Sequence, residues 1–178
     1  NDGSSNLQNI SNIKQYPVKS HFINLVSNFN NISEIKKNWI TSQNILNLDK
    51  KIKILKTHNA FCNIEGDNFT DNKNTLGVIH IIRDPRNVIT SVKNYFSKKN
   101  LDSAKEFLFD EKRHILSNEK VGNFPLVTPI FSWGGHYKSW SLIKKNYLLI
   151  KYENLIKNSK KEFEKIKKYL SKILKINF

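Results

Sequence analysis

Residues 78–96 read VIHIIRDPRNVITSVKNYF, and this stretch decides the fold. Its first five residues are β-branched apart from one histidine, which is typical of a strand buried on both faces. The pattern then changes, because Asp84 is a good N-cap, Pro85 suits the first helical position, and apolar residues recur afterwards at helical spacing. A strand that runs straight into a helix indicates an α/β fold, and ligands bind at such junctions.

Arginine is rare in this chain, and two of its arginines lie at that junction. Of the 30 Lys and Arg residues, only Arg83, Arg86 and Arg113 are Arg. The planar guanidinium matches phosphate oxygens in a bidentate way, and a helix start adds N–H donors and a positive dipole end. Salt bridges to Asp84 or Asp110 explain the arginines equally well, so spacing alone leaves an anion site and surface ion pairs as alternatives.

The composition bounds the class of protein. A chain of 178 residues with eleven Phe, six Tyr and three Trp predicts one globular domain, and its net charge of +15 suggests polyanionic or phosphorylated partners. Lys-rich codon usage also produces basic proteins without any ligand. The single cysteine, Cys62, permits no internal disulfide, and no apolar run is long enough to span a membrane. These features predict a reducing, cytoplasmic location.

Strands alternate with helices along the chain, which predicts a three-layer parallel sheet with helices on both faces. The expected strands are 51–56, 78–82 and 147–151, and the expected helices are 34–48 (capped by Ser33), 85–96, 103–116, 133–145 and 159–174. In the last helix the apolar stripe is expected at Phe163, Ile166, Leu170 and Ile173. Residues 59–75 are polar and are expected to form a loop.

Each expected strand ends in residues that can do chemistry. The first delivers Lys56 and His58, the second delivers Arg83 with Ser91 two turns into the helix, and the third delivers Tyr152. Because the carboxyl ends of parallel strands share one edge, these residues are expected to converge. The remaining histidines, among them His80, His114 and His136, lack metal-ligand spacing, so no metal site is predicted.

These segments occur in an order that resembles a known family. RDPRNVITS (83–91) is similar to the segment that holds the 3′-phosphate in sulfotransferases using 3′-phosphoadenosine 5′-phosphosulfate. Leu55-Lys56-Thr57-His58 resembles the Lys-Thr-His segment of the cytosolic-type enzymes. Ser132-Trp133, Trp140 and LLIKYENL (148–155) resemble the family's Trp-containing helix and Tyr-Glu-Asp strand end. The resemblance covers roughly residues 50–158.

The resemblance implies a P-loop NTPase-like fold and transfer of a sulfuryl group from that nucleotide to a hydroxyl or amine of a small molecule or glycan, without a metal. By the family pattern His58 is the general base, Lys56 steadies charge on the transferring group, Arg83 and Ser91 grip the 3′-phosphate, and Tyr152 lies near the adenine. Each of these residues also has an ordinary explanation as a loop, surface, helix or core-edge residue. Trp133 and Trp140 are interpreted as core residues rather than ligand contacts.

Two segments of the family pattern are not found. Tyr16-Pro17-Val18-Lys19-Ser20 resembles the Gly-Lys-Ser/Thr phosphate loop only superficially, and the late Arg-Lys-Gly segment is absent. We therefore interpret 1–178 as a single sulfotransferase-like domain truncated at both ends, lacking the strand with the phosphate loop and inactive alone. The alternatives are a P-loop kinase relative, or a basic nucleic-acid or polyanion-binding module suggested by the eight Lys in 157–175. No specific nucleic-acid partner is expected.

Overall fold

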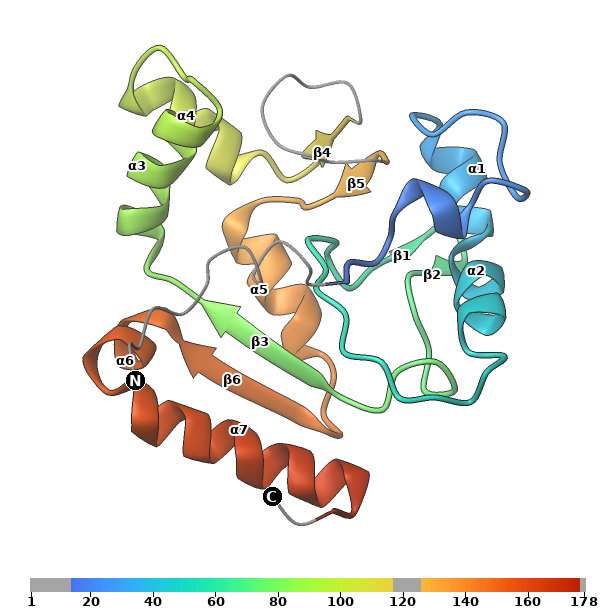
Figure 1. Cartoon of the computed structure of the whole chain (residues 1–178). Helices are drawn as coiled ribbons and strands as arrows, with labels where there is room; N and C mark the ends of the chain where they lie inside the picture. Colours follow the sequence, from blue (N-terminus) through green and yellow to red (C-terminus); the bar gives the residue numbers. More distant parts are fainter. Residues whose placement is uncertain (1–13, 117–125, 177–178) are drawn as a thin grey trace, which may run out of the picture.

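A computed structural model describes residues 14–116 and 126–176 (Figure 1). The elements in chain order are η2 (Lys19–His21), α1 (Ile32–Lys37), α2 (Trp39–Leu46), β1 (Asn63–Ile64), β2 (Asp67–Asn68), β3 (Val78–Ile82), α3 (Pro85–Tyr95), α4 (Leu101–Phe109), β4 (His114–Ile115), β5 (Thr128–Pro129), α5 (Trp133–Ser141), β6 (Tyr147–Lys151), α6 (Tyr152–Lys157) and α7 (Ser159–Leu174).

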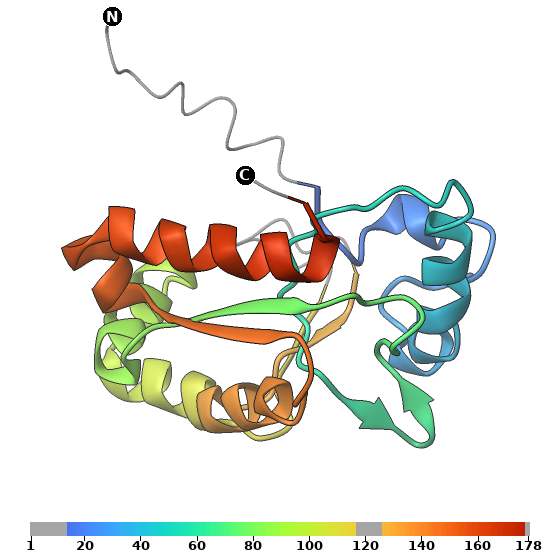
Figure 2. The same ribbon diagram turned by 90° about the horizontal axis from the view of Figure 1, so that it is seen from below.

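The centre of the α/β part is a parallel pair of strands. β3 and β6 pair with Val78 opposite Tyr147 and Ile82 opposite Lys151. α7 covers one face of this pair and α5 lies on the other, as the edge-on view in Figure 2 shows. The helix–sheet–helix layering and the bounds of both strands agree with the sequence prediction. The expected burial of β3 on both faces is only partly confirmed, because His80 is its buried residue and Ile81 is 52% exposed.

The junction after β3 forms as its sequence predicts. The Asp84 carboxylate accepts a hydrogen bond from the Arg86 N–H at 2.9 Å, and Pro85 opens α3. The apolar side of α3 packs through Val92 against a cluster of buried side chains, which are Ala104, Phe107, Leu108 and Ile115. This packing fixes the direction in which α3 leaves the sheet, and with it the place of Ser91.

The expected strand at 51–56 is wrong. Among the described residues Lys56 makes only an isolated parallel bridge to Gln15. In this bridge the Tyr16 N–H donates to the Lys56 carbonyl and the Lys56 N–H donates to the Lys14 carbonyl, each at 2.9 Å. Ile52 and Ile54 are 60% and 72% exposed, so the alternation of Lys and Ile buries no face of a sheet. Two strand ends, rather than three, therefore share the edge at which the site residues were expected to meet.

Three expected helices are shorter than the sequence suggested. The stretch 34–48 is divided into α1 and α2 at Asn38, and the cap of α1 is Asn31, which accepts from the Ser33 N–H, rather than Ser33. The helix expected at 103–116 ends at Phe109, because the chain becomes extended at Asp110 and then forms β4. The helix expected at 133–145 ends at Ser141.

The last helix has the expected bounds but a different buried face. Phe163 is 56% exposed, whereas its neighbour Glu162 is 3% exposed and pairs with Lys165 at 2.6 Å. The predicted stripe is therefore wrong at Phe163. Tyr169 fixes the other end of α7 to the sheet, since its hydroxyl donates to the Asn146 carbonyl at 2.6 Å.

The segment 59–75 is not only loop, because it contains the β1–β2 hairpin. Lys36 of α1 is buried beneath this hairpin, with its Nζ 2.8 Å from Glu65, 3.0 Å from Asp67 and 3.1 Å from the Ile64 carbonyl. The Lys36 ammonium therefore ties the hairpin to α1. Residues 16–20 run from the isolated bridge at Gln15 into η2.

The approach to β3 should tolerate no side chain at Gly77. A Cβ at this position would overlap the Tyr169 hydroxyl and lie 3.0 Å from the Asn146 carbonyl oxygen, whereas a Cβ at Gly134 would meet nothing within 4 Å. Gly77→Ala should lower the free energy of unfolding by about 1–3 kcal/mol, as overpacking does. Gly134→Ala should raise it by up to about 1 kcal/mol because alanine favours a helix.

Urea unfolding of both variants measures this difference. Equal stabilities of the Gly77→Ala variant and the original chain would contradict the close packing of α7 against the start of β3.

Candidate active site

Arg83, Ser91 and Tyr152 lie together beyond the ends of β3 and β6. Arg83 and Tyr152 each follow a residue of the directly opposed pair Ile82 and Lys151, so the parallel register places them side by side. The Arg83 guanidinium carbon lies 4.9 Å from the centre of the Tyr152 ring, and its Nη1 donates to the Ser91 hydroxyl at 2.9 Å. The structure thus brings together the three residues expected at a nucleotide.

This cluster has the chemistry of an anion site. A guanidinium carries five N–H donors in one plane, and the Ser91 hydroxyl can turn to donate to an incoming oxygen. The ring of Tyr152 lies against the guanidinium and offers a flat surface beside it. Arg83 is half-buried while Ser91 is exposed, so a ligand can reach both groups from solvent.

The other two arginines are held in ion pairs. Arg86 binds the Asp84 carboxylate with its Nε and Nη2, the latter at 2.5 Å, and this contact lowers the pKa of Asp84 to about 2. Arg113 lies 3.3 Å from Asp110. For these two residues the structure favours the ion pair, which leaves Arg83 as the candidate for an anion site.

The segment that carries His58 is held by α5 rather than placed at a strand end. The backbone from His58 to Phe61 lies along α5, whose side chains donate to or accept from it at three points. His136 Nε2 lies 3.3 Å from the His58 carbonyl, and Trp140 Nε1 donates to the Asn59 carbonyl at 3.0 Å. The Phe61 N–H donates to the Ser139 hydroxyl at 3.1 Å.

The first turn of α5 links this segment to Arg83. Trp133 Nε1 donates to the Arg83 carbonyl at 3.2 Å, and Trp133 and His136 are three residues apart on one helix face. The backbones of His58 and Arg83 are therefore held by neighbouring side chains of the same helical turn. This contact, rather than a shared sheet edge, brings the expected base and the expected phosphate-binding residue into one neighbourhood.

The imidazoles around α5 are held neutral. Partial burial, followed by the charges of Lys56 and His136, lowers the pKa of His58, although the residue remains open to solvent. Burial against α5 lowers the pKa of His80 to about 4, and its Nδ1 lies 2.7 Å from the Tyr147 hydroxyl. Burial likewise lowers the pKa of His136. A neutral His58 at pH 7 can accept a proton.

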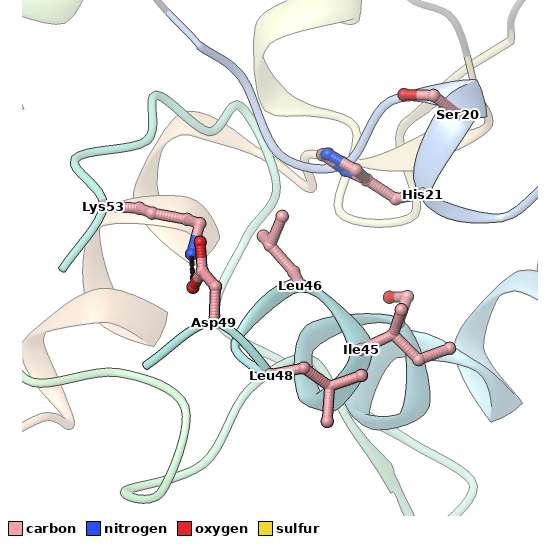
Figure 3. Close-up of a pocket in the computed structure, with 8 residues that line it drawn as sticks. Ser20, His21, Ile45, Leu46, Leu48, Asp49 and Lys53 are labelled. Carbon is pink, nitrogen blue, oxygen red and sulfur yellow. Dashed lines mark hydrogen bonds and ion pairs between the residues drawn. The ribbon is translucent and has the colours of Figure 1, made fainter. Parts of the chain in front are cut away.

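A hollow of the surface lies apart from these residues. Figure 3 shows it between η2 and α2, with a volume of about 440 Å³, mostly aliphatic walls and an ion pair between Lys53 and Asp49. None of the predicted site residues lines it. In residues 14–116 and 126–176 no group of three or more His, Cys, Asp or Glu side chains could hold a metal ion. Over the same residues, no helix is both long and apolar enough to cross a bilayer.

Three residues of this site were not singled out from the sequence. Trp133 packs against the core cluster around α3, as the sequence predicts, but its Nε1 also binds the Arg83 carbonyl. His136 and Glu153, which the sequence does not mark as site residues, likewise bind the backbone of a site segment. Contacts to main-chain carbonyls and amides cannot be predicted from residue types, because every residue has these groups. The place of Glu153 near the site could have been predicted, because it follows Tyr152 at the end of a strand expected beside β3.

The comparison with known proteins agrees with this arrangement. The sulfotransferase domain model matches residues 5–175 of the chain. The chain belongs to the sulfotransferase domain family. It is 32% identical over 100 residues to "3-beta-hydroxysteroid sulfotransferase" of Cavia porcellus and 31% identical over 100 residues to "3-alpha-hydroxysteroid sulfotransferase" of the same species. Each match covers 55% of this chain and 32% of the relative, so the matched part spans about a third of each relative's length.

Family membership answers one question that the sequence left open. The sulfotransferase domain model covers nearly the whole chain, which favours the family resemblance over a P-loop kinase relative. The basic α7 is then the covering helix of the sheet, with its lysines on the solvent side.

The neutral histidines predict that this sulfotransferase domain loses stability in acid. The pKa of His80 is about 4 in the folded chain and 6.5 in a free side chain, so between these values the unfolded state binds more protons. The contribution of neutral His80 to the free energy of unfolding is complete above pH 6.5 and should be lost as the pH drops toward 4. Unfolding free energies measured across this range test the prediction.

Two variants separate the charge from the hydrogen bond. His80→Phe should flatten the pH dependence, whereas Tyr147→Phe removes the same hydrogen bond and should leave the slope in place. Equal slopes in the two variants would exclude His80 as a source of the acid sensitivity.

Proposed function

We propose that this domain binds 3′-phosphoadenosine 5′-phosphosulfate and takes part in transfer of its sulfuryl group to a hydroxyl or amine acceptor. The main support for this proposal is the Arg83–Ser91–Tyr152 cluster, in which a guanidinium, a hydroxyl and an aromatic ring meet at one strand-to-helix junction. The family match supports the reaction class, because sulfotransferases use this nucleotide.

Arg83 and Ser91 bind the 3′-phosphate in this proposal. The guanidinium offers bidentate donors, and Ser91 supplies one further hydrogen bond from the second turn of α3. Tyr152 lies against Arg83 and extends the surface toward the adenine, which its ring can stack on. The N-terminus of α3 adds a favourable dipole for the anion.

His58 is the general base and Lys56 the cation of the transfer step. The neutral imidazole takes the proton of the acceptor hydroxyl or amine as the acceptor atom bonds to sulfur. The bond between sulfur and the phosphate oxygen breaks, and adenosine 3′,5′-bisphosphate leaves with the electron pair. Lys56, exposed two residues before His58, steadies negative charge on the transferring group.

The nucleotide role is tested by binding of adenosine 3′,5′-bisphosphate to this chain, measured by calorimetry. Arg83→Ala should weaken binding by about tenfold or more, because hydrogen bonds between charged groups contribute about 1.5–3 kcal/mol. Arg113→Ala removes the same charge from an arginine held by Asp110 and should change affinity far less. Equal losses in both variants would show that only net charge matters, as for a polyanion binder.

The salt dependence of the same titration separates specific from general binding. A sulfotransferase domain should prefer the 3′-phosphorylated nucleotide over adenosine 5′-phosphate, whereas a polyanion binder should show a steep salt response and no such preference.

The base role is tested by sulfuryl transfer in the native full-length protein, with a hydroxysteroid as the first acceptor because both curated relatives carry it in their names. His58→Ala should lower kcat by about 10²–10⁴-fold, the usual contribution of a general base. Nucleotide affinity should stay close to that of the original protein. Unchanged turnover in His58→Ala would exclude His58 as the base.

A further inference from the structure

The peptide unit between Arg83 and Asp84 is held from both sides. Its carbonyl accepts a hydrogen bond from Trp133 Nε1 at 3.2 Å, and its N–H donates to the Glu153 carboxylate at 2.8 Å. The two partners come from different elements, α5 and the start of α6. Both polar groups of one planar unit are therefore bound, in opposite directions, by side chains far from it in sequence.

From this geometry we infer that Trp133 and Glu153 are positioning residues that aim the Arg83 guanidinium at its anionic ligand. The inference rests on the proposed nucleotide binding by Arg83. Fixing this peptide plane restricts the backbone torsion that follows the Arg83 Cα and the torsion that precedes the Asp84 Cα. The first torsion sets the direction in which the Arg83 side chain leaves the backbone, and the second sets the start of α3.

Glu153 acts here through its position as well as its charge. The contact with the Asp84 N–H is the main cause that lowers the pKa of Glu153, so the carboxylate is ionised and a strong acceptor. Glu153 follows Tyr152 at the start of α6, and Tyr152 lies against the Arg83 guanidinium. The same two residues therefore hold both the backbone and the side chain of Arg83.

Trp133 holds the other side through a group that a phenylalanine lacks. The residue is partly buried among the side chains around α3, and its ring is stacked on Tyr137 with 5.9 Å between ring centres. Trp133→Phe keeps an aromatic ring in this place and removes the indole N–H. The matched control is Trp39→Phe, because the Nε1 of the buried Trp39 has no hydrogen-bond partner among the described residues.

The Glu153 contact is tested by a pair of variants with equal charge. Glu153→Gln and Glu153→Ala both remove a negative charge near Arg83, but only glutamine keeps an oxygen that can accept from the Asp84 N–H. The difference between the two variants therefore reports the hydrogen bond alone. Glu153 is exposed, so neither change threatens the core.

The experiment titrates adenosine 3′,5′-bisphosphate into the chain and its four variants, and measures amide exchange at Asp84 without ligand. Trp133→Phe should weaken binding about fivefold, and Glu153→Ala should bind about fivefold more weakly than Glu153→Gln, the effect of one hydrogen bond. Asp84 should exchange faster in Trp133→Phe and Glu153→Ala. Trp39→Phe should lower stability but keep affinity within about twofold, because distant sites act independently.

Two negative outcomes have different meanings. If the original chain binds the nucleotide and the Trp133 and Glu153 variants bind it equally well, the positioning role is overturned while the proposed function stands. If the original chain does not bind the nucleotide, the proposed function fails and the inference fails with it, even where Asp84 exchange shows that the peptide is held.

Discussion

The parallel pairing of β3 with β6 is the constraint on which the site depends. Because Ile82 lies opposite Lys151, the residues that follow them, Arg83 and Tyr152, leave the sheet side by side. The guanidinium then lies against the ring, and α3 begins where its second turn can present Ser91. A shift of one residue in this register would turn every side chain of β6 to the opposite face and separate these groups.

Much of this arrangement could be predicted from local sequence. The stretch 78–96 gives the strand, the cap at Asp84 and the helix, because burial and capping there act in the same direction. Prediction failed where local pattern and tertiary context disagree. Alternating Lys and Ile at 51–56 looks like a strand but finds no neighbour to bury its isoleucines, and a continuous helical pattern at 34–48 breaks at Asn38, whose amide binds the carbonyls of Leu25 and Glu34 instead.

The side chains of the candidate site could be predicted from the sequence, but the backbone contacts that hold them in place could not. The family pattern singled out Arg83, Ser91 and Tyr152, which the structure places in contact. His136 binds the His58 carbonyl and Trp133 binds the Arg83 carbonyl, so one turn of α5 connects the two segments. A pattern of residue types cannot predict such contacts with backbone carbonyls. The sequence also predicts His58 at a sheet edge, whereas in the structure its carbonyl is bound by His136 of α5.

The way α5 binds the segment 58–61 determines which of its side chains can vary. The hydrogen bonds from His136, Ser139 and Trp140 go to main-chain atoms, which every amino acid except proline offers. The ring of Phe61, however, packs on Trp140 with 5.5 Å between ring centres, and Asn59 and Ala60 are fully buried. Tolerance to substitution in this segment should therefore be confined to the exposed side chain of His58, and chemistry rather than packing would limit change there.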